Sequence, residues 1–220
     1  MIKAANPDLE SVLDQIAGAR RSIDARRSML VAISGIDASG TGYVTSRLAS
    51  SSHAQGVRVA TINVDGWLNL PAVRLSTIDP AEHFYQHAIR FEEMLSELVF
   101  PLRDRKGLHL EADHATETGT AYGRFVYEFA DIDVILLEGI YLLKRAFQRY
   151  YDLSVWIECS FATALRRAIA RSQEGLSIGE TISAYRTIYF PAQEIHLERD
   201  YPRGAANLFV DNDNEPSVTV

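Results

Sequence analysis

The chain has 220 residues, of which 47% are hydrophobic, and a formal net charge of -7. This length suits a single domain spanning 1–220, and the acidic balance argues against nucleic acid as a partner. The only cysteine, Cys159, leaves no internal disulfide or thiolate metal cage and suits a reducing compartment. No apolar run is long enough to cross a membrane, so we expect a cytoplasmic protein.

Residues 1–28 are expected to form an amphipathic helix. Asn6 and Pro7 offer a cap and a proline at the first helical position, and apolar residues then recur at helical spacing. Packing on a sheet is favoured over binding to a partner.

A glycine-rich turn follows the apolar run from Met29 to Ser34, which predicts a buried parallel strand. The spacing of Gly35 and Gly40 fits the P-loop rule G-x-x-x-x-G, although an ordinary tight turn is the alternative. Backbone N–H groups in such a turn, and the positive end of the helix after it, bind phosphate whatever the side chains are. The predicted phosphate-binding residues are Gly35, Asp37, Ala38, Ser39, Gly40, Thr41, Gly42 and Tyr43.

The turn departs from the rule at both of its chemical positions. Thr41 stands where the lysine is expected, and Gly42 stands where a hydroxyl residue is expected. A cation that reaches the outer phosphates and one magnesium ligand are therefore missing.

Two acidic residues follow predicted strands and are candidates for the chemistry. Asp65 comes after the strand Val57–Val64, at the sheet edge where ligands bind in open α/β folds, although an Asp-Gly turn is the alternative. Glu138 follows the four apolar residues Val134–Leu137 and matches the second P-loop signature, a carboxylate that holds magnesium directly or through water. A loop cap is the alternative there.

Between these two strands the sequence predicts a helix and then an irregular segment. Asp79, as a cap, and Pro80, at the first helical position, predict the start of a helix, and Pro101 is expected to end it. His83 and His87 lie four apart on it, but without a third ligand we expect no metal there. Residues 102–130 form a substrate-side excursion in which periodicity fails.

The C-terminal third is predicted to hold a strand, an arginine-rich helix and a lid at 171–180. Ser160 caps the helix that carries Arg167 and Arg171, which either close over phosphates or form solvated surface. Ser177 begins a capping box, Pro191 kinks or interrupts the helix after it, and a last strand at 207–211 precedes a loose tail at 212–220.

Taken together, these motifs resemble the uridine kinase and phosphoribulokinase family of P-loop kinases. The resemblance covers the chain from about Ser28 to Asp213 and rests on five stretches taken in order. They are residues 31–40, 65–67 (Asp-Gly-Trp), 136–141 (Leu-Leu-Glu-Gly-Ile-Tyr), 164–171 and 210–212.

The resemblance implies an α/β P-loop NTPase fold, with a parallel five-stranded sheet, helices on both faces and a small lid. It implies ATP and Mg²⁺ as cofactors and phosphoryl transfer to a hydroxyl of a small metabolite, such as a nucleoside. Asp65 would be the base, Glu138 would serve the magnesium shell with Asp65 beside it, and Arg167 and Arg171 would act from the lid. No membrane or nucleic-acid partner is implied, and self-association stays open.

The two departures in the loop leave two hypotheses open. An active kinase needs a substitute for the lysine, for which Lys144, Arg167 and Arg171 are candidates, while Thr45 could supply a displaced hydroxyl. The alternative is a pseudokinase that binds nucleotide in a regulatory or binding role and transfers no phosphate.

Overall fold

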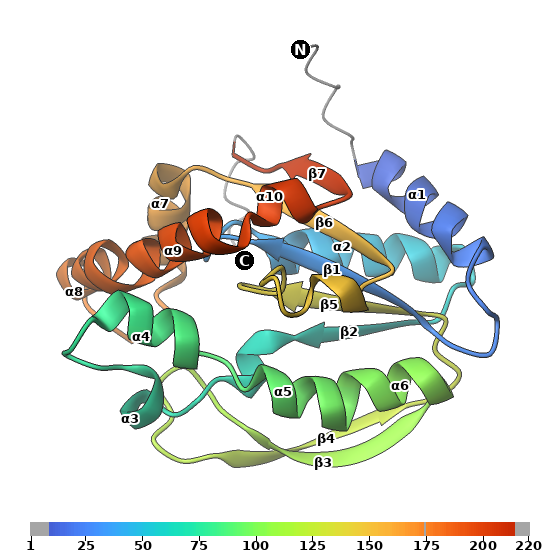
Figure 1. Ribbon diagram of the computed structural model, residues 1–220, viewed down its shortest axis with the longest axis horizontal. Coiled ribbons are helices and arrows are strands. Elements are labelled where there is room, and N and C mark those ends of the chain that lie inside the picture. Colours follow the sequence, from blue (N-terminus) through green and yellow to red (C-terminus); the bar gives the residue numbers. More distant parts are fainter. Residues whose placement is uncertain (1–8, 174, 214–220) are drawn as a thin grey trace.

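The computed structural model describes residues 9–173 and 175–213. Its centre is a five-stranded sheet in the order β2-β5-β1-β6-β7, in which every neighbouring pair is parallel (Figure 1). This confirms the predicted parallel five-stranded sheet. The strands are β1 (Met29–Gly35), β2 (Val59–Asn63), β5 (Val134–Gly139), β6 (Leu153–Glu158) and β7 (Leu208–Asp211).

Two apolar cores pack on the two faces of this sheet. Alternate β1 residues point to opposite faces: Met29, Val31 and Ile33 join one core, and Leu30 and Ala32 join the other. The helices α1 (Leu9–Arg21) and α2 (Thr41–Ala54) cover the first face. The second face is covered by α4 (Pro80–His87), α5 (Phe91–Glu93), α6 (Phe100–Arg105), α7 (Phe161–Arg171) and α9 (Phe190–Asp200).

The helical segment after β2 is longer and more broken than predicted. A short α3 (Pro71–Arg74) precedes α4, whose cap is the Asp79 side chain, and a bridge between Leu68 and Ile89 then interrupts the helix. A π-helical stretch, Met94–Val99, leads directly into α6. Pro101 therefore does not end the helix, which was expected to stop there and instead continues to Arg105.

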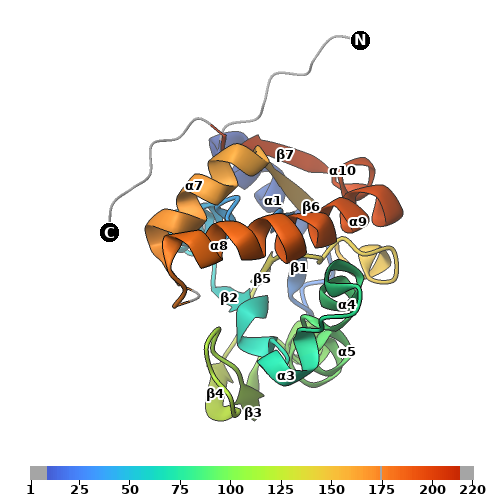
Figure 2. The same cartoon turned by 90° about the vertical axis from the view of Figure 1, so that its left-hand side faces the viewer.

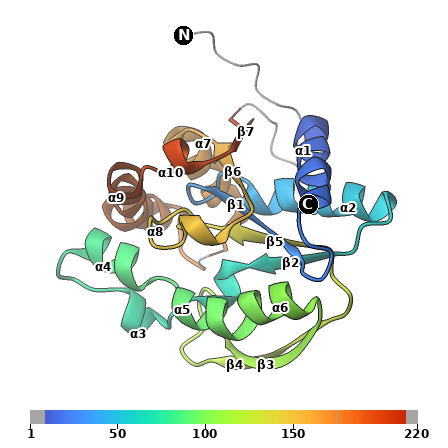
Figure 3. The ribbon, with the colours of Figure 1, turned by 45° about the vertical axis from the view of Figure 1, so that its right-hand side comes forward.

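Residues 102–130, expected to be an irregular excursion, contain the end of α6 and an antiparallel hairpin. Strands β3 (Leu108–His114) and β4 (Gly123–Phe129) pair over their whole length and form a sheet of their own. The hairpin lies beneath α5 and α6, on the β2 side of the parallel sheet (Figure 3).

The predicted caps in the C-terminal part are present. The Ser160 hydroxyl accepts a hydrogen bond from the Thr163 N–H at the start of α7, and Ser177 and Glu180 form the capping box of α8 (Ile178–Ala184). A π-helical stretch, Tyr185–Tyr189, joins α8 to α9, so these helices cross the molecule as one rod (Figure 2). A short α10 (Pro202–Ala205) precedes β7.

Two of the terminal predictions lie outside the part of the chain that the structure describes. Asn6 and Pro7 belong to that undescribed part, as do residues 214–220 of the predicted loose tail at 212–220, whose first residue, Asn212, is instead buried and donates to the Ser39 carbonyl. Among the described helices, none is long and apolar enough to cross a membrane.

Candidate functional site

The glycine turn after β1 presents backbone amides at the start of α2. Ala38 and Gly40 have left-handed φ values of 58° and 94°, and this alternation turns successive N–H groups toward one side. Gly40 is also the N-cap of α2 and provides no side-chain cap, so the first amides of the helix lack an intrahelical acceptor. Such a helix start is a ready anion site.

Both glycines of the motif are required by close packing. A Cβ on Gly40 would lie 2.2 Å from Asn212 Nδ2, and a Cβ on Gly35 would lie 2.4 Å from Ser39 Oγ and 2.9 Å from the Ile157 carbonyl oxygen. The loop can therefore pass this close to its neighbours only because neither residue has a side chain.

Ser39 and Arg167 hold the loop in shape through hydrogen bonds that involve its backbone. The Ser39 carbonyl accepts hydrogen bonds from Arg167 Nη1 at 3.1 Å and from Asn212 Nδ2 at 2.7 Å. The Ser39 N–H donates to the Ile36 carbonyl, and its hydroxyl is buried. Arg167 also donates to the Asn212 carbonyl at 2.6 Å, so both residues hold the loop in shape, and their phosphate contacts stay a prediction.

Asp37 links the loop to the predicted lid. Its carboxylate accepts from Arg171 Nη2 at 3.0 Å and from the Tyr185 hydroxyl at 2.8 Å, and Arg171 donates to Tyr185 at 2.9 Å. A cation from the end of α7 thus lies at the tip of the loop.

Asp65 lies directly after β2 in a short 3-10 turn, Val64–Trp67. Its N–H donates to Asn63 Oδ1 at 2.7 Å, which fixes the turn. The side chain opens into a cleft, but the surrounding protein removes enough water to raise the pKa of Asp65 to about 6, and repulsion from Asp37 adds to the rise. The charge of Arg171 opposes this rise in pKa, so Asp65, Asp37 and Arg171 interact electrostatically.

Glu138 lies next to the loop, at the end of β5, and is buried. One of its oxygens is 3.5 Å from the position that a Cβ of Gly42 would occupy. Burial raises the pKa of Glu138 to about 7; hydrogen bonding to Thr41 opposes the rise, and the charge of Asp65 adds to it. Glu138 therefore lies beside the start of α2, close enough to Asp65 for the two charges to interact.

The cleft beside Asp65 has a volume of about 690 Å³. It lies between β2 and the hairpin and is lined by Asp65, Gly66, His114, Glu117, Phe125 and Tyr127 among others, with Gln173 of the predicted lid. Its size is typical of a small-molecule site.

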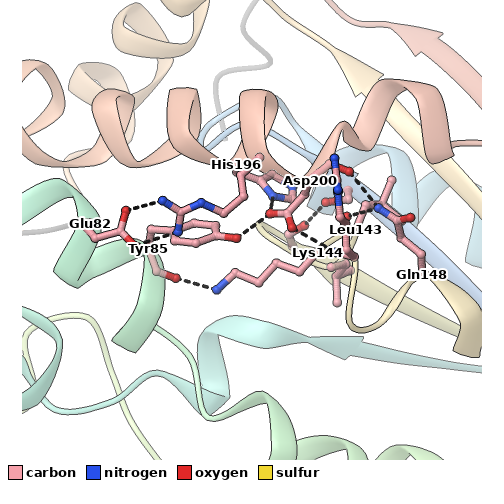
Figure 4. A network of polar contacts seen from close by, with 12 residues as sticks. Glu82, Tyr85, Leu143, Lys144, Gln148, His196 and Asp200 are labelled. Atoms are coloured by element: carbon pink, nitrogen blue, oxygen red, sulfur yellow. Dashed lines mark hydrogen bonds and ion pairs between the residues drawn. The ribbon is translucent and has the colours of Figure 1, made fainter.

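Lys144 is not a substitute for the P-loop lysine. Its Nζ donates to the Tyr85 carbonyl at 2.6 Å and lies 4.0 Å from the centre of the Tyr85 ring (Figure 4). Burial lowers the pKa of Lys144 to about 8. The segment after β5 directs the Lys144 side chain toward α4. Lys144 therefore contacts α4 and not the loop. Tyr43 likewise interacts with Arg47 on α2, whose Nη1 donates to the Tyr43 hydroxyl at 3.2 Å.

Two functional candidates escaped the sequence prediction. Tyr185 contacts Asp37 from a helix about 150 residues away, which no local pattern indicates. Arg74 is buried and donates to the Asn69 and Glu117 carbonyls. Its charge partly opposes the rise in the pKa of Asp65. Its only sequence signal is its position in a short helix after Asp65.

Comparison with other proteins finds similarity in structure. No family model matches the chain. No curated protein sequence matches it. A possible uridine kinase from Bacillus stearothermophilus is 19% identical, with a TM-score of 0.71, over 92% of this chain and 99% of that one.

Two further solved structures have the same architecture. A provisionally assigned fructose transport system kinase from Silicibacter sp. TM1040 is 19% identical, with a TM-score of 0.67, over 93% of this chain and 99% of that one. A D-glycerate 3-kinase from Cryptococcus neoformans is 15% identical, with a TM-score of 0.59, over 84% and 86%. The chain therefore has the α/β fold of the P-loop kinases that resemble uridine kinase.

Proposed function

We propose that this protein transfers the terminal phosphoryl group of ATP to a hydroxyl of a small metabolite, with a uridine-like nucleoside as the preferred acceptor. The observation that carries the proposal is the pair of interacting carboxylates, Asp65 and Glu138, of which Glu138 lies beside the amide-lined start of α2. Phosphoryl transfer needs phosphate binding, charge neutralisation and a base at one place. The solved structures of similar fold include proteins described as kinases of different metabolites.

Asp65 is the proposed base. A pKa of about 6 leaves most of its carboxylate ionised at pH 7 and able to accept the proton of the acceptor hydroxyl. Its place on the wall of the 690 Å³ cleft lets an acceptor approach from the hairpin side.

The residues beside α2 fit a magnesium ion. Mg²⁺ prefers oxygen ligands, and Glu138 provides a carboxylate close to the Thr41 hydroxyl. When bound, the ion would neutralise charge on the phosphates. The backbone amides of the loop would hold those phosphates in place.

Arg171 is the proposed replacement for the lysine missing at position 41. Arg171 donates to Asp37 in the loop, and its positive charge stabilises the ionised form of Asp65. Within the described part of the chain, Lys106 pairs with Asp133 at 3.0 Å and Lys144 is held by α4. An arginine holds phosphate oxygens through its planar fork.

The test is a phosphoryl-transfer assay with ATP, Mg²⁺ and a panel of nucleosides. We expect transfer to uridine or a related nucleoside, and a loss of about 10² to 10⁴ in kcat for Asp65→Asn, which removes the base. Asp104→Asn, on the surface of α6, is the matched control. Absence of transfer to every acceptor, or full activity of Asp65→Asn, would overturn the proposal.

A nucleotide-binding protein without transfer is the second candidate. It is favoured by Thr41 and Gly42 and by the ion pair that ties Arg171 to Asp37. Saturable binding of ATP without any turnover, measured by calorimetry beside the transfer assay, would select this candidate.

A further inference from the structure

A second hollow, separate from the Asp65 cleft in most of its lining, runs along α2. It has a volume of about 370 Å³, and its lining includes Gly42, Thr45 and Glu138. Thr45 is 3% exposed, and its hydroxyl has no hydrogen-bond partner among the residues that the structure describes. Buried hydroxyls are nearly always hydrogen-bonded, so this oxygen is available to a ligand or a water molecule in the hollow.

The lining has the chemistry of a site for a hard cation. Besides the Glu138 carboxylate and the Thr45 hydroxyl, it is formed by Ser46, Ala49, Ser50, His53, Val59, Thr61 and Asn63. Oxygen donors predominate, and none of the described lining residues is a lysine or an arginine. A buried carboxylate among neutral oxygens is suited to a divalent cation and poorly suited to an anion.

Thr45 also has the right position on the helix to compensate for Gly42. Residues three apart lie on the same face of a helix, and side chains lean toward its N-terminus. Thr45, Gly42 and Glu138 line the same hollow, so the Thr45 hydroxyl lies on the side of the helix that a hydroxyl at position 42 would use.

We propose that Thr45 and Glu138 together hold the divalent cation of this protein, with the Thr45 hydroxyl replacing the one lost at Gly42. The inference rests on the proposed function for the identity of the ion as Mg²⁺. It goes beyond that function by assigning a ligand at a position that the P-loop rule leaves unspecified.

The experiment is a titration of the full chain with Mn²⁺ alone, followed by electron paramagnetic resonance of the free ion. Thr45→Val keeps the shape of the side chain and removes its oxygen, so we expect Mn²⁺ affinity to fall about tenfold or more. Ser51→Ala, on the same helix but outside the lining, is the matched control and should bind Mn²⁺ as the wild type does. The melting temperature of each variant checks that it is folded.

A second substitution tests the compensation directly. A Cβ at position 42 would meet Glu138 at 3.5 Å, an ordinary contact, so Gly42→Ser fits without displacing the loop. We expect Gly42→Ser to restore Mn²⁺ binding to the Thr45→Val variant. Wild-type affinity in folded Thr45→Val, no Mn²⁺ binding by the wild type, or no recovery in the double variant would each overturn the inference.

These outcomes are distinguishable from failure of the proposed function. Mn²⁺ binding that depends on Thr45, without phosphoryl transfer, would support the cation site and reject the kinase. Phosphoryl transfer together with Mn²⁺ binding that does not depend on Thr45 would support the kinase and reject the cation site.

Discussion

At the scale of single residues, the two carboxylates of the site make the fold less stable than it could be. Burying a charged group costs free energy unless the group is paired, and Glu138 is 7% exposed; among the described residues, the Thr41 hydroxyl opposes its desolvation. Such a cost is typical of a group kept for chemistry and not for stability.

Glu138→Gln should therefore stabilise the protein at alkaline pH. The pKa of Glu138 rises from 4.5 to about 7 on folding, so its contribution to the free energy of unfolding falls as pH increases from 4.5 through 7. At pH 8 the variant should gain up to about 3 kcal/mol over the wild type, and the gain should vanish near pH 4.5. Urea unfolding at both values measures it, with Glu128→Gln on the exposed face of β4 as control. A gain that grows on acidification would contradict the assignment.

Arg171 provides a second prediction at this scale. If it supplies the missing charge, Arg171→Ala should lower kcat by about 10³, the lower end for an arginine acting on transferring phosphate. Adding Thr41→Lys to that variant should recover most of the loss. The transfer assay measures both, and Arg166→Ala, a neighbour on α7 whose guanidinium donates to Thr163, is the control. An Arg171→Ala variant as active as the control would remove Arg171 from the mechanism.

At the scale of elements, the loop is held in shape by its contacts with the start and end of the C-terminal region. Arg167 on α7 and Asn212 after β7 both donate to the Ser39 carbonyl. The backbone conformation that exposes the loop amides thus depends on residues more than 120 positions away in sequence.

Gly40→Ala tests this dependence against a glycine that has the same backbone conformation elsewhere. Gly40 and Gly56 have φ values of 94° and 79°, but only at Gly40 would a Cβ meet another atom, at 2.2 Å. Gly56→Ala should cost about 1 to 2 kcal/mol of stability through strain alone and leave nucleotide binding intact. Gly40→Ala should also displace Asn212 and lower ATP affinity at least about tenfold by calorimetry. Equal ATP affinity in the two variants would show that the packing against Asn212 is dispensable.

The sequence predicted the elements whose signals are local. The apolar runs at β1 and β5 and the caps at Ser160 and Ser177 identified their elements, and the strand-end positions of Asp65 and Glu138 placed them at one edge of the sheet. The partners of Asp37 could not be predicted in this way, because they come from helices far along the chain.

The helix after Pro80 shows where a local rule fails. Pro101 was expected to end the helix, because proline lacks an N–H and crowds the preceding turn. In the structure, wide π-helical turns come immediately before the Phe-Pro pairs at Pro101 and at Pro191. Both helices pass their prolines, since a turn widened in this way accommodates a residue that cannot donate a hydrogen bond. The hairpin at 108–129 was missed although Leu108, Leu110 and Ala112 alternate with polar residues in β3, because a polar stretch separates the two strands and much of β4 is exposed.

At the scale of the whole molecule, a buried hydrogen bond joins α4 to α9. Asp200 on α9 accepts hydrogen bonds from the Tyr85 hydroxyl at 2.6 Å and from the Arg145 N–H at 3.0 Å, and His196 Nδ1 lies 2.7 Å from it (Figure 4). This group anchors one end of the rod formed by α8 and α9, whose other end leads back to the lid segment after α7.

Tyr85→Phe should loosen this anchor without touching the loop or the cleft. It leaves the buried Asp200 carboxylate short of one hydrogen bond, which should cost about 1 to 3 kcal/mol in the free energy of unfolding. Tyr201→Phe, at an exposed tyrosine next to the same aspartate in sequence, should cost much less. Urea unfolding measures both, and hydrogen exchange should show faster exchange confined to α4, α8 and α9. If Tyr85→Phe instead left both the stability and the exchange of these helices unchanged, the rod would have to be held by its apolar packing alone.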